Sequence, residues 1–127
     1  MAASFRDMAR ITLLMNSADA VDYRAGETVF SQGDPAEHMY VINEGEIEIV
    51  INGIVVDTCG PGEAFGEMAL IDRAPRSATA VAKADCRLVP LDTRRFLFMV
   101  TETPNFALQI MGNMAERLRK HNDRLVG

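Results

Sequence analysis

Two charged side chains, Glu67 and Arg76, lie in the segment of residues 60–80, which reads GPGEAFGEMALIDRAPRSATA. The guanidinium of Arg76 carries a planar set of N–H donors that fits two phosphate oxygens at once, a geometry that lysine lacks. A carboxylate such as Glu67 would be repelled by a phosphate unless it accepts hydrogen bonds, either from a ribose hydroxyl or from Arg76 itself. The two side chains therefore predict a binding site for a sugar phosphate and favour ligand sensing over catalysis.

Glycines and a short helix are expected to complete this site. Gly60, Gly62 and Gly66 permit backbone conformations closed to other residues, so the amide N–H groups around them can form a concave cradle for an anion. The run EMALI after Gly66 contains good helix formers, and the free N–H groups at the start of a short helix would point at the same anion. Ser77 offers one more hydroxyl donor. The alternative is that the charged pair is solvated at the surface and contributes little.

The sequence FGEMAL followed by PRSAT resembles the phosphate-binding cassette of the cyclic nucleotide-binding domain family. This family includes bacterial catabolite-activator proteins, regulatory subunits of cyclic-nucleotide-dependent kinases and cyclic-nucleotide-gated channels. The resemblance implies that Glu67 holds the ribose 2′-hydroxyl and that Arg76 neutralises the cyclic phosphate. It also implies a phosphate-binding role for neighbouring residues, namely Gly66, Met68, Ala69 and Ser77. The spacing of the two charged residues is similar to that of the kinase and channel branch, because the catabolite-activator cassette is slightly longer.

Two further groups of residues align with positions at which the family contacts the base. Ile49, Val56 and Cys59 match positions that pack against the purine, although each is equally well explained as ordinary core. His121 and Asn122 align with a threonine and a serine of the last helix that meet the adenine amine in the catabolite-activator branch. The sequence departs from that pattern here, although an Asn side chain can both donate to and accept from an adenine edge. Surface solvation of Asn122 and a register-setting place in a helix seam for His121 are the favoured explanations.

The chain has 127 residues, of which 48% are hydrophobic, and a net charge of -5. This is the size of one ordinary domain, so a single domain over residues 1–127 is expected. Cys59 and Cys86 are too few for a disulfide framework, which favours a reduced, cytoplasmic protein. The acidic charge gives no support to nucleic-acid binding. A membrane span or a secretory signal is not expected, because no stretch approaches ~18 unbroken apolar residues and Arg6, Asp7 and Arg10 interrupt the N-terminal region.

The residue pattern predicts a mainly β fold with flanking helices. Apolar residues at helical spacing from Phe5 to Met15 predict a helix over residues 1–17. Residues 18–91 contain short strand-like runs separated by turn residues, at 28–30, 39–42, 47–51, 54–58 and 78–81. Asn52 followed by Gly53 is a strong signal for a two-residue hairpin. Many short antiparallel strands at this spacing are typical of an antiparallel jelly-roll barrel.

Residues 92–127 are expected to form two C-terminal helices. Asp92 is the expected N-cap of the first, which runs through Val100, and Thr103 with Pro104 the expected cap and first position of the second. Along the second helix apolar residues step by four and three, as in the seam of a coiled coil, which favours a homodimer. The alternative is that this stripe covers the barrel. The stripe comprises Ala107, Met111, Met114, Leu118, His121 and Leu125. The charged residues Glu116, Arg117, Arg119, Lys120, Asp123 and Arg124 are expected to form a solvated face.

Three classes of function can be compared on this basis. The first, which we favour, is a non-enzymatic regulatory module that binds a cyclic nucleotide and whose last helix rearranges in response. The second is a jelly-roll enzyme of the cupin type, but two histidines, His38 and His121, cannot build a multi-histidine metal site. No catalytic or metal-binding residues are therefore expected. The third is a degenerate family member that acts as an interaction domain without ligand, which the presence of Glu67 and Arg76 disfavours.

The expected ligand is cyclic AMP, with cyclic GMP as the alternative and no other cofactor. Family members that prefer cyclic GMP often place a threonine beside the cassette arginine, whereas Ser77 is a shorter hydroxyl. DNA binding is not expected. In the family's regulators a helix-turn-helix domain follows the last helix, whereas here the last expected helix takes up the residues as far as Gly127. We expect the output to come from a separate protein partner or from a domain outside these 127 residues.

Overall fold

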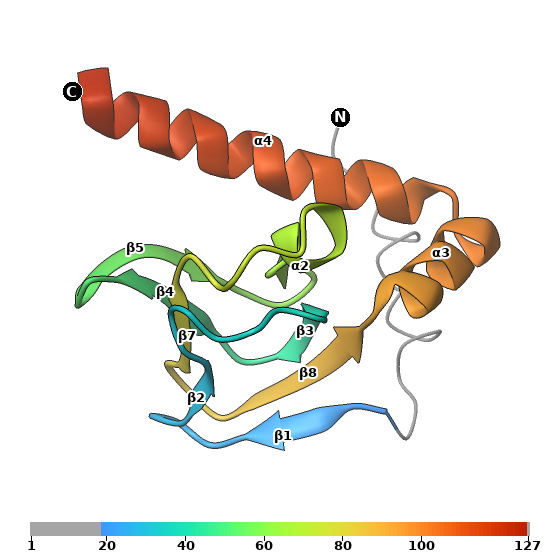
Figure 1. Cartoon of the computed structure of the whole chain (residues 1–127), viewed down its shortest axis with the longest axis horizontal. Helices are drawn as coiled ribbons and strands as arrows, with labels where there is room; N and C mark the ends of the chain where they lie inside the picture. Colours follow the sequence, from blue (N-terminus) through green and yellow to red (C-terminus); the bar gives the residue numbers. More distant parts are fainter. Residues whose placement is uncertain (1–18, 127) are drawn as a thin grey trace.

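Two four-stranded antiparallel β-sheets and three helices make up the described part of the chain in the computed structural model (Figure 1). The structure describes residues 19–126, and the side chains of residues 19–119. The helix expected over residues 1–17 lies outside the described residues. The expected fold class, mainly β with antiparallel jelly-roll strand order and flanking helices, is confirmed. Among the described strands no pairing joins one sheet to the other, so the sheets do not close into the expected barrel.

The strand order brings together segments that are far apart in the sequence. The first sheet has the order β1-β8-β3-β6, with β1 (Val21–Tyr23), β8 (Cys86–Leu91), β3 (Met39–Glu44) and β6 (Ala64–Phe65). The second sheet has the order β2-β7-β4-β5, with β2 (Thr28–Phe30), β7 (Thr79–Ala82), β4 (Ile47–Ile51) and β5 (Ile54–Cys59). Because β6 and β7 belong to different sheets, the segment 66–78 between them leaves one sheet and enters the other.

The strands β4 and β5 form the hairpin that the sequence predicts. They pair from Ile47 with Cys59 to Ile51 with Ile54, with a register shift between Ile49 and Val50, and Ile47 at the start of β4 is fully buried. Asn52 and Gly53 both have positive φ, 50° and 80°, as the two central residues of a type I′ turn require. Asn adopts this left-handed conformation more readily than most residues, so the local chemistry agrees with the observed turn.

The strand β8 is absent from the sequence-based expectations, and it contains a proline, a residue that is unusual in a strand interior. In the structure Pro90 pairs with Tyr40 of β3 on one side. On the other side β1 begins at Val21, which pairs with Leu88, so Pro90 lies past the end of that neighbour and is paired on one flank only. The strands β1 and β6 have three and two residues, which is too short for an alternating pattern to show.

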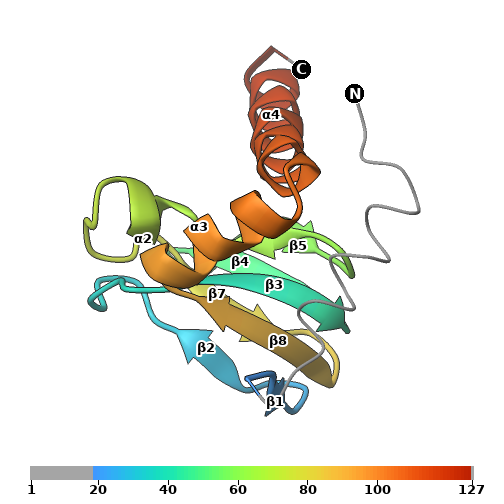
Figure 2. The same ribbon diagram turned by 90° about the vertical axis from the view of Figure 1, so that its right-hand side faces the viewer.

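Three helices follow from local signals in the sequence. They are α2 (Met68–Ile71), α3 (Thr93–Glu102) and α4 (Asn105–Val126), and α4 runs above α2 and the β4–β5 hairpin (Figures 1 and 2). Asp92 is the N-cap of α3 as predicted, since its Oδ1 accepts from the amide of Arg95 at 2.8 Å. The side-chain cap predicted for Thr103 is wrong, because within the described chain its buried hydroxyl has no hydrogen-bond partner. No helix in residues 19–126 is long and apolar enough to cross a membrane.

The strand β3 separates two clusters of buried side chains. Met39 and Val41 pack in one cluster with residues of the helices, including Phe106 of α4. Ile42 packs in the other cluster with residues of the second sheet, against which Tyr40 is partly buried. Alternate residues of one strand thus face the helices and the opposite sheet, as the geometry of an extended chain requires.

Candidate functional site

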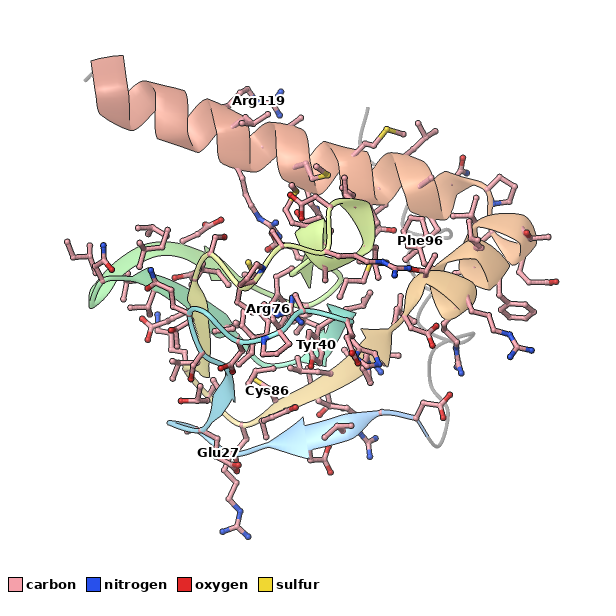
Figure 3. All side chains as sticks on the ribbon, viewed as in Figure 1. Glu27, Tyr40, Arg76, Cys86, Phe96 and Arg119 are labelled. Atoms are coloured by element: carbon pink, nitrogen blue, oxygen red, sulfur yellow. The ribbon has the colours of Figure 1, made fainter. Side chains whose placement is uncertain are left out.

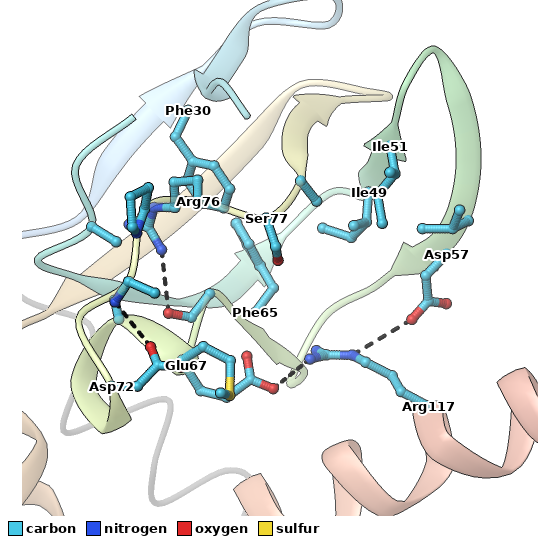
Figure 4. Close-up of a pocket in the computed structure, with 18 residues that line it drawn as sticks. Phe30, Ile49, Ile51, Asp57, Phe65, Glu67, Asp72, Arg76, Ser77 and Arg117 are labelled. Carbon is cyan, nitrogen blue, oxygen red and sulfur yellow. Dashed lines mark hydrogen bonds and ion pairs between the residues drawn. The ribbon is translucent and has the colours of Figure 1, made fainter. Parts of the chain in front are cut away.

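A pocket of about 400 Å³ opens between the segment 66–78, the β4–β5 hairpin and α4 (Figure 4). Its volume lies in the range of small-molecule sites, about 300–1,000 Å³. The lining includes most of the predicted ligand-binding residues, namely Ile49, Val56, Gly66, Glu67, Met68, Ala69, Arg76 and Ser77. It also includes Phe30, Asp57 and Arg117, which were not predicted to belong to the site.

Arg76 is fixed at one end of the pocket. Only 8% of the residue is exposed, and its guanidinium donates to two carbonyls, from Nη2 to His38 at 2.6 Å and from Nη1 to Gly66 at 3.3 Å. Its Cζ lies 3.9 Å from the centroid of the Phe30 ring, a stacking that guanidinium groups favour. Burial lowers the pKa of Arg76, because desolvation disfavours its charged form. The Nε–H is buried and has no partner among the described residues, so this buried cation is suited to an anionic ligand.

Gly66 permits the close approach of Arg76 to the backbone. A Cβ atom at residue 66 would lie 2.8 Å from Nη1 of Arg76, and the φ of +74° lies in the left-handed region. The predicted anion cradle is wrong for the other two glycines, which do not line the pocket. The amide of Gly62 donates to the carbonyl of Ile42 at 2.8 Å, and that of Gly60 donates to a carboxylate of the same turn at 3.0 Å. Both glycines therefore serve the turn between β5 and β6.

The helix α2 begins at the pocket, as predicted. Ala69 is buried and Met68 is partly exposed. The amide of Ala69 donates to the carbonyl of Gly66 at 3.2 Å, so this N–H is used within the turn and does not point freely into the pocket. Ser77 follows Arg76 directly and is exposed at the pocket surface (Figure 4).

Glu67 is buried and is paired with Arg117 of α4, and not with Arg76, the protein neighbour proposed for it from the sequence. Nη1 of Arg117 donates to Oε1 of Glu67 at 2.6 Å, and Nη2 donates to the carbonyl of Ala64. Nε of Arg117 lies 3.5 Å from Oδ2 of Asp57, so the guanidinium lies between two carboxylates (Figure 4). The prediction that Arg117 belongs to a solvated face is therefore wrong, since 19% of its side chain is exposed.

The position of Arg117 on α4 contains the signal that could have identified it. The residue follows Ile110 by two helical turns and Met114 by nearly one, and both of these pack into the core. Helical spacing thus places Arg117 on the face that covers the sheets. Its charged neighbours Glu116 and Arg119 are exposed and pair with each other at 2.5 Å, and Arg119 lies on the outer face of α4 (Figure 3).

An apolar wall forms the other part of the pocket. Ile49 and Val56 contribute to it, and their predicted contact with the base stays a prediction. Cys59 does not line the pocket and is fully buried between the sheets, so the core explanation holds for this residue. Burial raises the pKa of its thiol to about 11. The side chains of His121 and Asn122, the two predicted contacts on the last helix, lie outside the described residues.

Residues 20–103 match the sequence profile of the family described as the cyclic nucleotide-binding domain. This chain belongs to that family. The match covers both sheets, the pocket segment and α3, and ends before α4. The family assignment agrees with the charged pair Glu67 and Arg76 in one pocket and with the jelly-roll strand order.

Several known proteins are similar to this cyclic nucleotide-binding domain. It is 42% identical over 72 residues to the cAMP-dependent protein kinase regulatory subunit of Yarrowia lipolytica, covering 57% of this chain and 19% of the relative. It is 28% identical over 120 residues to the CRP-like cAMP-activated global transcriptional regulator of Mycobacterium tuberculosis, covering 91% and 54%. The solved catabolite activator protein of Thermus thermophilus is 28% identical, with a TM-score of 0.74 over 96% of this chain and 58% of that one. The chain therefore spans less than two thirds of each of these proteins.

Proposed function

We propose that this chain is a single-domain, non-enzymatic sensor module that binds cyclic AMP in the pocket around Glu67 and Arg76. The observation that carries the proposal is a buried guanidinium with an unused N–H donor, in the same pocket as a buried carboxylate. A cyclic nucleotide supplies an anionic phosphate for the first group and a ribose hydroxyl for the second. A degenerate module that binds no ligand is the alternative, but it would gain nothing from keeping a buried donor without a partner.

Each part of the ligand has a proposed place in the pocket. The phosphate lies against residues of the segment 66–78, at the start of α2 and near the end of the segment, namely Gly66, Met68, Ala69, Arg76 and Ser77. The ribose 2′-hydroxyl donates to Glu67. The purine extends toward Ile49 and Val56, whose apolar side chains offer a surface on which a base can be buried. His121 and Asn122 are proposed to approach the same base from α4.

Cyclic AMP is favoured over cyclic GMP as the ligand. The kinase regulatory subunit and the transcriptional regulator to which the chain is similar are both named for cyclic AMP. The residue beside Arg76 is Ser77, which is shorter than the threonine expected for a preference for guanine.

The helix α4 is proposed to respond to the ligand through Arg117. Because Nη1 of Arg117 donates to Glu67 at 2.6 Å, a ribose hydroxyl on Glu67 alters a contact that α4 itself makes. The ligand can shift the helix only if it binds two positions of α4 with different affinity. The contact between Arg117 and Glu67 supplies a difference of that kind, since its geometry depends on where α4 lies.

A homodimer through α4 is proposed as the form in which the module acts. Met111 and Leu118 are exposed on this helix, and 63% of Leu118 is accessible. Met114, which was predicted in the same seam, is partly buried against the cluster that contains Phe106, so it offers less surface to a second copy than Leu118 does. We place the module in the cytoplasm, where it acts on a protein partner or on an output domain beyond these 127 residues, without contacting DNA or a membrane itself.

Titration calorimetry with cyclic AMP and cyclic GMP tests the proposed function. We expect saturable binding of cyclic AMP, tighter than that of cyclic GMP, and a melting temperature that rises with ligand concentration because only the folded state binds. Adenosine 5′-monophosphate, which has the same base but no cyclic phosphate, is the control ligand and is expected to bind weakly. If neither cyclic nucleotide bound at millimolar concentration, the chain would be a degenerate family member.

A further inference from the structure

A carboxylate in the apolar wall of the pocket has no role in the function proposed so far. Asp57 lies on β5, with 9% of its side chain exposed, and it lines the pocket together with Ile49 and Val56. Burying a charged side chain in an apolar wall costs free energy, and an apolar residue of similar size is often at least as stable there. The ion pair with Arg117 offsets part of this cost, and the position of Asp57 at the apolar wall also brings its carboxylate to the place proposed for the base.

The carboxylate and the guanidinium beside it present complementary hydrogen-bonding groups. Oδ1 of Asp57 accepts from the amide of Thr58 at 2.9 Å, and Oδ2 lies 3.5 Å from Nε of Arg117. A carboxylate offers about four lone-pair sites, so it can accept from several donors at once. The Nε–H of Arg117 is buried and donates to no group in residues 19–119. A buried acceptor and a buried N–H donor thus lie side by side at the apolar wall (Figure 4).

We propose that Asp57, together with Arg117, reads the hydrogen-bonding edge of adenine, with Asp57 accepting from the 6-amino group. The inference rests on the proposed function, because it requires the phosphate at Arg76 and the base at the apolar wall. The 6-amino group of adenine is a donor that lies between two acceptors, N1 and N7, so either edge of the base matches one acceptor and one donor of the protein. Guanine matches with one edge only. Its other edge presents O6 and N7, which are both acceptors, so one of them would be repelled by the carboxylate of Asp57.

A purely structural role for Asp57 leads to a different expectation. If Asp57 did no more than hold Arg117 against Glu67, its removal would lower the affinity for every cyclic nucleotide by the same factor, because Glu67 meets the ribose that all of them share. If Asp57 reads the amine, the loss of affinity depends on the base. The two roles are separated by comparing ligands that differ in the 6-amino group alone.

Titration calorimetry of the full chain with cyclic AMP and with purine riboside 3′,5′-cyclic monophosphate makes this comparison. The second ligand carries hydrogen in place of the 6-amino group. For the unmodified protein we expect cyclic AMP to bind roughly 5- to 100-fold more tightly, the discrimination typical of a pair of base-edge hydrogen bonds. In Asp57→Leu, which fills the wall without an acceptor, we expect the two ligands to bind equally.

Two further variants keep the test decisive. Asp72→Asn is the matched control, because Asp72 also lines the pocket but its Oδ1 accepts from the amide of Ala74 at 3.0 Å, and it is expected to leave the affinity ratio unchanged. Asp57→Asn keeps the shape and a weaker, uncharged acceptor, so it is expected to give an intermediate ratio and serves if Asp57→Leu does not fold.

The outcomes separate this inference from the proposed function. Equal binding of both ligands to the unmodified protein, or a ratio that Asp57→Leu or Asp57→Asn left unchanged, would overturn the role of Asp57 while cyclic nucleotide binding stood. If neither ligand bound to the unmodified protein, the proposed function itself would be wrong.

Discussion

Replacing Arg76 by alanine is predicted to weaken cyclic AMP binding by about 30-fold to several thousand-fold. The guanidinium is buried, and its Nε–H is the donor left for a ligand after Nη1 and Nη2 donate to backbone carbonyls. Leaving the partner of a buried charge unpaired costs about 2 to 5 kcal/mol, and each 1.4 kcal/mol corresponds to tenfold in affinity. Arg76→Lys keeps the charge but cannot reach both carbonyls and the phosphate, so it is expected to recover only part of the loss.

The assay is titration calorimetry, with thermal unfolding measured on each variant to show that it is folded at the titration temperature. Arg76→Ala also removes donors from the carbonyls of His38 and Gly66, so its melting temperature is expected to fall. Arg87→Ala is the matched control, because Arg87 forms an exposed ion pair with Asp22 at 3.2 Å and neither residue lines the pocket. An affinity of Arg76→Ala within twofold of the unmodified protein would refute the assignment of the phosphate to Arg76.

Three other predictions concern the backbone, α4 and the surface. Gly66→Ala places a Cβ 2.8 Å from Nη1 of Arg76 and is expected to weaken cyclic AMP binding at least tenfold. The control is Gly26→Ala, at a similar positive φ but with nothing within 4 Å of the new Cβ, which should lower the free energy of unfolding by about 1–2 kcal/mol without changing the affinity. Equal affinities of the two variants in calorimetry would contradict this reasoning. Arg117→Gln removes the ion pair between α4 and Glu67, so hydrogen exchange of the α4 amides should become less sensitive to cyclic AMP, and an undiminished response would exclude Arg117 as the link. Leu118→Glu should give a monomer in light scattering, and the melting temperature of that monomer should not be lowered by the substitution, because Leu118 is exposed. Met114→Glu should lower the free energy of unfolding by about 2 kcal/mol or more, because the Met114 side chain packs against the core. If the unmodified protein were a monomer at high concentration, the dimer proposal would be wrong.

The parts of the fold that were predicted correctly depend on short-range chemistry. The positive φ of Asn52 and Gly53 and the N-cap contact of Asp92 are determined by neighbours within four residues, so the sequence predicts them directly. The strand β8 was missed because its acceptance of Pro90 depends on where the distant strand β1 ends, which local sequence does not reveal. The two sheets stay open because no described strand of one sheet pairs with a strand of the other, and such pairing between remote strands is likewise not revealed by local sequence.

The same division holds for the site. The charged pair and Gly66 are recognisable because their spacing lies within one segment, and all of them line the pocket. The partner of Glu67 could not be identified in this way, since Arg117 is fifty residues away and reaches Glu67 only once α4 packs on the sheets. Asp57 was missed for a related reason, because a strand residue shows its face of the sheet only after its register is known.

The pleat of β3 joins the cluster packed against the helices to the cluster packed against the second sheet. Tyr40 faces the opposite sheet, where its ring stacks on Phe65 at 5.3 Å and lies 5.9 Å from the Cζ of Arg76, two residues that line the pocket (Figure 3). Met39, the residue before it, is fully buried against α3 and α4 on the opposite side. One planar peptide unit joins the two residues, so a shift of the backbone at one of them is passed directly to the other. A displacement of α4 that shifted the backbone at Met39 would therefore reach the ring beside the Arg76 guanidinium through one peptide link.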